Sequence, residues 1–459
     1  MGSLEERLAN LSPGQRAMLE MRLQQGRTAK AAPPREESDD ENLVLIRSVD
    51  SVDELLSKFY GRYPWPWPAK KFDFLEDQDF ETVMVNQDVG DWSHRTLPVE
   101  PRIWVAGCGV NQAILTALRF PRAQVVGSDV SVKSLDLCGQ MAQALGIGNL
   151  TLREESINHA GYDAEFDFVV CTGVIHHNAD PRVTLARLAA ALKPGGIMEL
   201  MVYNRFHRII TSAFQKAVRL FSEGRSDVDF EKEVQLATRL VEDLPVRDVL
   251  EKAFTQYMDW SESDFADLLV QPVEHTYTVQ SLEELVRSCG LEYVLPCISN
   301  YGKHLAAHLS WNLEVRHPDL VREYYALPDS RRWQITNLLL HDKSPLLWFY
   351  VRRGDSATSR RTESEVCEDF LEQTFERAGT LQRSFLREED GSYSLLPEPV
   401  VHPFAPPQRL EQEIAEATEP DLPMREVLHR LGVDLSFPSV NRVRTRLTTS
   451  AFPYLRAVR

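Results

Sequence analysis

The stretch that decides the fold is Arg-Ile-Trp-Val-Ala-Gly-Cys-Gly-Val-Asn-Gln, residues 102–112. Its apolar, β-prone first half runs directly into two closely spaced glycines, Gly107 and Gly109. A segment with helical character follows and stops at Pro121. Glycines let the backbone turn sharply and approach a ligand closely, so this pattern predicts a strand–loop–helix nucleotide site.

A second apolar run, residues 124–129, ends in an acid about twenty positions after the glycine loop. A carboxylate at that place, Asp129, is positioned to bind the ribose hydroxyls of a nucleotide. A dinucleotide fingerprint requires a third glycine three residues after the second, where this chain has Gln112. The sequence therefore disfavours NAD and FAD and favours a nucleoside ligand without a pyrophosphate.

The chain around this loop resembles the class I S-adenosylmethionine (SAM)-dependent methyltransferases. The resemblance covers residues 101–203 tightly and residues 50–353 loosely, and it implies SAM as the cofactor. A short arm at residues 11–20 resembles the helices that lead into modules of peptide and polyketide assembly lines, which favours a natural-product type. Five elements carry the family resemblance in order: Val105-Ala-Gly-Cys-Gly109, Asp129, Glu154-Glu155-Ser156-Ile157, the segment 166–177 and Leu192-Lys-Pro-Gly-Gly196.

The resemblance also implies which residues hold the cofactor. The family often has an acid at the position of Val105 or Ala106, so here the ammonium group of SAM lacks its usual partner. Thr172 opens the loop that faces both cofactor and acceptor in the family. The other expected contacts follow the three parts of SAM. The methionine part contacts Gly107, Cys108 and Gly109, the ribose contacts Asp129, and the adenine edge contacts Glu155, Ser156 and Ile157.

Two histidines, His176 and His177, follow the fourth strand and are the candidate catalytic residues. Histidine has the intrinsic pKa to accept a proton from an acceptor O–H or N–H group. The favoured alternative is structural hydrogen bonding, since methyl transfer depends mainly on alignment and on the exclusion of water.

An aromatic, proline-rich run at residues 60–67 precedes the glycine loop and cannot form a regular helix. We expect it to cover the cofactor and shield the sulfonium by cation–π contact; the alternative is a core-packing arm. Two polar clusters, at residues 203–207 and 271–277, are expected near the acceptor. The candidate lid and acceptor residues are Tyr60, Tyr63, Trp65, Tyr203, Asn204 and His275.

Strands and helices alternate between residues 102 and 203, which predicts an α/β, doubly wound, Rossmann-like class I methyltransferase sheet. Two last strands, at 291–298 and 346–352, are expected to form an antiparallel hairpin at one sheet edge. The predicted domains are a helical arm with a mobile linker (1–45), an aromatic lid segment (46–100), the methyltransferase core (101–355) with a helical insertion (about 205–280), and a smaller C-terminal α+β accessory module (366–459).

The C-terminal module is expected to follow a polar break at residues 357–365. Its predicted elements are a helix at 366–378, a hairpin around Asp390-Gly391 and further helices. The last helix is expected to be basic and to serve docking or dimerisation rather than DNA binding, although the element order is like that of a winged-helix module. Because the break looks like a boundary, we expect truncation after residue 358 to leave a folded core. The arginines expected to make the last helix basic are Arg442, Arg444, Arg446 and Arg456.

The overall composition restricts location and partners. A formal net charge of −17 over 459 residues disfavours nucleic acid and anionic membranes as partners. Six scattered cysteines without a Cys-x-x-Cys pair argue against a metal site and a disulfide framework and favour the cytoplasm. The N-terminal residues lack the apolar core of a signal peptide, and no apolar run approaches the roughly 18 residues that span a bilayer.

The function expected is methyl transfer from SAM to a small-molecule acceptor in secondary-metabolite biosynthesis. The acceptor is free or linked to a carrier protein, no metal takes part, and a homodimer is one expected state. One alternative is a protein or RNA methyltransferase, which a basic or extended groove near residues 203–215 would favour. The other alternative is a non-catalytic SAM-binding scaffold, which turnover would distinguish.

Overall fold

The computed structural model describes most of the chain beyond its N-terminal arm. The predicted arm and linker at 1–45, Trp67, and parts of the ranges 205–280 and 357–365 lie outside the described residues. All described residues belong to one compact unit. They are residues 49–66, 68–221, 229–243, 261–298, 310–340, 344–354 and 360–458.

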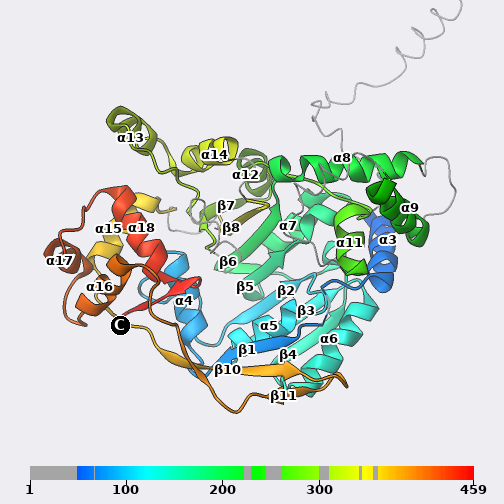
Figure 1. Cartoon of the computed structure of the whole chain (residues 1–459), viewed down its shortest axis with the longest axis horizontal. Coiled ribbons are helices and arrows are strands. Elements are labelled where there is room, and N and C mark those ends of the chain that lie inside the picture. The colour runs from blue at the N-terminus through cyan, green and yellow to red at the C-terminus, as the bar shows by residue number, and fades with distance from the viewer. Residues whose placement is uncertain are drawn as a thin grey trace, which may run out of the picture. The chain divides into compact units, whose positions relative to one another are not determined.

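A seven-stranded sheet forms the centre of the molecule, with the strand order β4-β3-β2-β5-β6-β8-β7 (Figure 1). Neighbouring strands from β4 to β6 pair in parallel, and β8 is antiparallel to both β6 and β7. The bounds are β2 (Arg102–Ala106), β3 (Gln124–Asp129), β4 (Leu150–Glu154), β5 (Phe166–Thr172), β6 (Leu192–Tyr203), β7 (Leu291–Pro296) and β8 (Leu346–Arg353).

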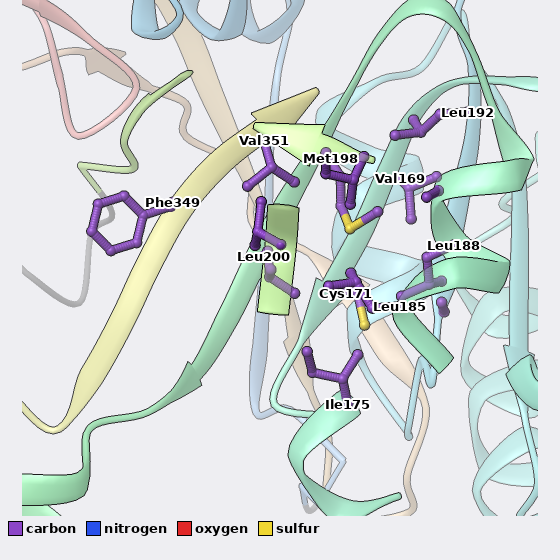
Figure 2. Packing of buried hydrophobic residues seen from close by; sticks show 14 of the residues in the cluster. Val169, Cys171, Ile175, Leu185, Leu188, Leu192, Met198, Leu200, Phe349 and Val351 are labelled. Atoms are coloured by element: carbon purple, nitrogen blue, oxygen red, sulfur yellow. The ribbon is translucent and has the colours of Figure 1, made fainter. Parts of the chain in front are cut away.

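Helices cover both faces of this sheet, so the predicted doubly wound α/β fold is confirmed. Successive residues of a strand point to opposite faces, and Trp104 and Val105 accordingly join different hydrophobic clusters. Figure 2 shows the Trp104 side, where strand residues such as Val169 and Met198 pack against Leu188. The helices are α5 (Gln112–Arg119) and α6 (Val132–Ala144) on the Val105 side, and α7 (Pro181–Ala191) and α12 (Val279–Ser288) on the other.

The strand order reverses at β2. From this strand the chain runs outward through β3 and β4, then returns to β5 on its other side. Such a reversal opens a crevice at the carboxyl ends of the two central strands, which is where open α/β sheets bind ligands. The glycine loop begins directly after β2, at residue 107.

The last two strands differ in part from the prediction. β7 and β8 pair antiparallel as expected, but no tight turn joins them. The segment between them includes α13 (Pro318–Tyr325) and α14 (Asp329–Leu339). β8 lies between β6 and β7 in the sheet, and Trp333 of α14 packs into the core beside Phe349.

Four helices gather at the ligand edge of the sheet. They share a cluster of buried apolar side chains that includes Phe59, Tyr63, Phe214 and Leu269. The described part of residues 205–280 is therefore mainly helical, as predicted, and packs on the lead-in segment. The helices are α3 (Val49–Arg62), α8 (Arg205–Phe221), α9 (Phe230–Asp243) and α11 (Glu262–Leu269).

The start of the C-terminal region differs from the prediction of a helix at 366–378. α15 (Glu363–Glu372) ends earlier, and β9 (Phe375–Arg377) follows because it pairs with β15 (Leu455–Ala457). The hairpin around Gly391 forms as predicted between β10 and β11. The other elements are β10 (Thr380–Arg387), β11 (Tyr393–Leu395), β12 (Val400–His402), α16 (Arg409–Ala417), α17 (Met424–Arg430), α18 (Phe437–Leu447), β13 (Thr448–Thr449) and β14 (Phe452–Pro453).

The prediction of a basic last helix is right for three of its four arginines and wrong for Arg456. Arg456 lies in β15, not in a helix, and pairs with Asp77. Of the arginines on α18, Arg444 is buried, and the other two form ion pairs: Arg442 with Glu314, and Arg446 with Glu411. Acidic groups from distant segments therefore compensate these charges.

The C-terminal region is joined to the segment that precedes the sheet. β1 (Lys71–Leu75) pairs with β10, and the helix α4 (Phe80–Asp88) contacts β13. The buried Gln87 side chain donates to Thr448 O (2.9 Å) and Leu455 O (3.1 Å). Residues 71–88 thus fold against the tail rather than over the cofactor loop, although they fall within the predicted lid segment. The boundary between 355 and 366 stays a prediction, but these contacts argue against a core that folds without the tail.

Candidate cofactor and acceptor site

A cavity of about 950 Å³ opens at the carboxyl edge of the parallel strands. Its volume lies at the upper end of the range of small-molecule sites, about 300–1,000 Å³. The predicted cofactor residues all contribute to its wall, because parallel strands bring their following loops to the same edge. They are Gly107, Cys108, Gly109, Asp129, Glu155, Ser156, Ile157 and Thr172.

The glycine loop leaves no room for side chains. Gly107 and Gly109 have φ values of +68° and +53°, in the left-handed region that favours glycine. A Cβ atom at Gly109 would lie 2.7 Å from Trp65 O, and one at Gly107 would lie 2.5 Å from a methyl group of Val174. The backbone itself therefore forms this part of the wall.

Asp129 connects the glycine loop to the end of β3. Its Oδ2 accepts a hydrogen bond from Gly109 N (2.8 Å), and its Oδ1 accepts one from Ser131 N (2.8 Å). Burial raises the pKa of this carboxyl, and the backbone hydrogen bonds oppose that rise. A carboxylate oxygen has room for more than one donor, so Asp129 fits the binding of ribose hydroxyls.

The wall beyond β4 contains a residue that the sequence did not suggest. Ser156 Oγ donates to Asp53 Oδ2 (2.5 Å), and Glu155 Oε2 accepts from Tyr162 OH (2.7 Å). Asp53 comes from α3, about a hundred residues earlier, and also lines the cavity. The sequence around Asp53 shows an ordinary acidic residue on an amphipathic helix, and nothing in it indicates that this residue lines a cavity.

The two candidate bases occupy different positions. His177 lines the cavity, and its Nδ1–H donates to Val273 O (2.8 Å). Burial, the largest cause, lowers the pKa of His177 to about 4, so the ring is neutral near pH 7 with its lone pair on Nε2. His176 is fully buried outside the cavity wall. Its ring centroid lies 4.1 Å from that of His177, in an edge-on arrangement, and 4.1 Å from that of Tyr203, in a tilted one, and burial holds its pKa well below the ordinary value.

Three of the six predicted lid and acceptor residues line the cavity, namely Tyr60, Trp65 and Tyr203. Tyr63 does not: it is 1% exposed and packs on Phe59 among the helices α3, α8 and α9. Asn204 is also buried outside the wall, where its side chain donates to Ser344 O (2.7 Å). His275 bonds Asn178 O through Nε2 (3.0 Å) and is likewise outside the wall.

The part of the wall that the sequence analysis missed comes from α8, α11 and β8. Its main residues are Arg208, Asp264, Asp267, Leu346 and Trp348, and together with the predicted Tyr203 they form what we call the acceptor half. The spacing of Asp264 and Asp267 places both on one helix face. That spacing is the available sequence signal, and it does not indicate which face meets a ligand.

With this geometry in place, the comparisons identify the domain. A family model described as a methyltransferase domain matches residues 104–200. The chain carries a class I SAM-dependent methyltransferase domain. SAM is accordingly its cofactor. That the glycine loop, Asp129 and the loop after β4 hold it stays a prediction.

Several curated proteins are similar to this chain. An uncharacterized protein of Synechococcus sp. is 30% identical over 254 residues, which are 53% of this chain and 60% of that protein. A ubiquinone biosynthesis O-methyltransferase of Aromatoleum aromaticum is 29% identical over 120 residues, 25% of this chain and 50% of that enzyme. A tRNA 5-carboxymethoxyuridine methyltransferase of Escherichia coli is 31% identical over 115 residues, 23% of this chain and 42% of that enzyme. The matches thus span 42% to 60% of the length of these relatives.

A solved structure supports the fold over a longer range. PKMT2 from Rickettsia typhi, in complex with AdoHcy, superposes with a TM-score of 0.53 at 15% sequence identity. The match covers 85% of this chain and 77% of that chain. At this identity it shows a shared fold, which extends well beyond residues 104–200.

Proposed function

We propose that this protein transfers the methyl group of SAM to a small-molecule acceptor in secondary-metabolite biosynthesis. The observation that carries the proposal is the single continuous cavity of about 950 Å³. Its wall includes both the glycine loop with Asp129 and the acceptor half with Asp267 and Trp348. A cofactor and a small acceptor therefore fit next to each other in one space.

The reaction requires alignment more than an elaborate catalytic set. SAM supplies an electrophilic sulfonium methyl group, and an acceptor must approach it in line. The helices α3 and α11 contribute Tyr60 and Asp267 to the wall, so they limit the access of water. His177 is neutral and keeps a lone pair on Nε2, which suits a proton acceptor; His176 lies outside the cavity wall.

The charges near the acceptor half support a small molecule over RNA. A basic groove at residues 203–215 would favour RNA, yet Arg208 there is buried and paired with Glu274, and Arg205 donates to Thr276 O (3.1 Å). Binding of a phosphate backbone depends on accessible Lys and Arg. The net charge of −17 opposes such binding further.

Partners and location remain part of the proposal. A carrier-protein-linked acceptor and a homodimer are both compatible with a cavity at the sheet edge. Across the described ranges, none of the helices combines the length and the apolar character that crossing a bilayer requires. A cytoplasmic location stays a prediction from cysteine usage.

The test is incubation with methyl-labelled SAM and the metabolite, protein and RNA fractions of the source organism. We expect label in one small molecule, identified by mass. Label in the protein or RNA fraction alone would reject the small-molecule acceptor, and SAM binding without any transfer would favour a scaffold.

A substitution at Asp129 tests the proposed placement of the cofactor. Asp129→Ala removes charge-assisted hydrogen bonds worth about 1.5–3 kcal/mol each, so SAM affinity should fall about tenfold or more. Asp136→Ala, at an exposed position on α6, is the matched control. Unchanged SAM affinity in a folded Asp129→Ala protein would reject this placement.

A further inference from the structure

The acceptor half of the cavity has an excess of negative charge. Its carboxylates are Asp264 and Asp267, and its arginine is Arg208. Arg208 Nε donates to Glu274 Oε1 (2.9 Å), Nη2 contacts Glu274 Oε2, and both side chains are buried. The positive charge of Arg208 also lowers the pKa of Asp267, but Arg208 is paired with Glu274, so one arginine faces three carboxyl groups.

The two aspartates differ in how their oxygens are used. Asp264 Oδ2 accepts from Ser261 N (3.0 Å) and Ser261 Oγ (2.7 Å) in the capping box that begins α11. Asp267, one turn later, accepts at Oδ1 from Tyr60 OH (3.1 Å). Within the described part of the chain, its Oδ2 has no hydrogen-bond partner. Asp267 is only 6% exposed, and burial raises its pKa to about 7.

Two aromatic side chains line the same cavity as this carboxylate, and Tyr60 is hydrogen-bonded to it. Tyr60 is fixed by Gln271, whose Nε2 donates to its hydroxyl oxygen (2.7 Å). Trp348 is oriented by a hydrogen bond from its Nε1 to Glu199 (3.0 Å) and lines the same cavity. Aromatic faces attract cations, and a buried carboxylate with an oxygen that accepts no hydrogen bond is stabilised by a cation.

We propose that the acceptor is an amine, which binds as its ammonium form to Asp267 beside Tyr60 and Trp348. This inference rests on the proposed methyl transfer and names its acceptor class. Asp267 takes a proton from the ammonium group and becomes a neutral carboxylic acid. The freed nitrogen lone pair then forms the N–C bond as the C–S bond of the sulfonium breaks, and that electron pair stays on sulfur. The products are an N-methylated ammonium ion and S-adenosylhomocysteine.

The charged groups around Asp267 give the expected pH dependence its sign. Tyr60 faces Asp267 from α3, Arg208 from α8, Asp264 from α11 and Glu274 from the segment before α12. Arg208 and Glu274 stay charged as a pair near neutral pH. Amine affinity should therefore rise as the pH is raised through about 7, because Asp267 ionises while a simple amine stays protonated to about pH 10.

The experiment is calorimetry with three aromatic probes of similar size, in the presence of S-adenosylhomocysteine. The probes are 2-phenylethylamine, 2-phenylethanol and 3-phenylpropanoate. We expect the amine to bind and the alcohol and carboxylate to bind at least about tenfold more weakly. Asp267→Asn should lower amine affinity about tenfold and remove its rise with pH. Glu262→Gln, an exposed position on the same helix, is the matched control and should change neither.

Each other outcome has a defined meaning. Equal binding of the alcohol or the carboxylate, unchanged amine affinity in Asp267→Asn, or no amine binding at millimolar concentration would overturn the amine proposal. A loss of S-adenosylhomocysteine affinity in Asp267→Asn would also overturn it, because Asp267 would then hold the ammonium group of the cofactor. If the wild-type protein binds neither SAM nor S-adenosylhomocysteine, the proposed function itself fails.

Discussion

Replacing Gly109 by alanine tests whether the cofactor loop and the aromatic run depend on each other. Gly109 has a φ of +53°, and a Cβ atom there would lie 2.7 Å from the carbonyl oxygen of Trp65. The left-handed conformation costs alanine about 1–2 kcal/mol. The contact with a backbone oxygen adds about 1–3 kcal/mol, the range for an overpacked site. We therefore expect Gly109→Ala to lose about 2–5 kcal/mol of unfolding free energy.

A matched variant separates the two costs. Gly146 has a φ of +68°, and a Cβ atom there would meet nothing within 4 Å, so Gly146→Ala carries the backbone cost alone. Urea unfolding should show the difference of about 1–3 kcal/mol between the variants. Because Gly109→Ala must displace the loop or residues 65–66, SAM affinity by calorimetry should fall about tenfold, and Gly146→Ala should stay near wild type. Equal stability and equal SAM affinity in the two variants would refute the reasoning.

Three further predictions concern the aromatic run, the C-terminal tail and a buried carboxyl group. Trp65→Ala should lower methyl transfer with little change in melting temperature, whereas Tyr63→Ala should lose about 3–5 kcal/mol of stability and keep normal turnover per folded molecule; the reverse pattern would exchange their roles. Truncation after residue 358 should give insoluble or unfolded protein by yield and circular dichroism, because it exposes the apolar surface around Trp92 and removes the partners of Gln87; a soluble, SAM-binding fragment would contradict this. Burial raises the pKa of Asp88 from 3.8 to about 7, so the folded state holds its proton more tightly and this group makes stability fall as pH rises from about 4 to 7. Asp88→Asn should flatten that fall in unfolding experiments, and an unchanged pH profile would show that Asp88 does not cause it.

The sequence alone determined the parallel half of the sheet and the cofactor edge. β2, β3 and β5 each contain a short apolar run and are followed by a helix, so their signal is local. The loops after parallel strands meet at one edge by topology, which brought Gly107, Asp129, Glu155 and Thr172 to one cavity without any knowledge of side-chain packing.

Only the tertiary structure decided which neighbouring residues face that cavity. Tyr60 lines it and Tyr63 does not, because the packing of α3 against α8 and α9 buries one ring and leaves the other at the wall. His176 and His177 are adjacent in sequence, yet only His177 lies on the wall.

The local sequence also could not predict the residues of the acceptor half or the position of the C-terminal tail. Asp267 reaches Tyr60 across 207 positions of sequence, and Gln87 bonds Leu455 across 368. Such contacts depend on how separate helices and strands pack, and the residues concerned have ordinary local patterns. The glycine loop could be recognised because its backbone geometry restricts the residues at the loop itself, whereas a buried carboxylate acquires its chemistry from partners that only the folded chain brings to it.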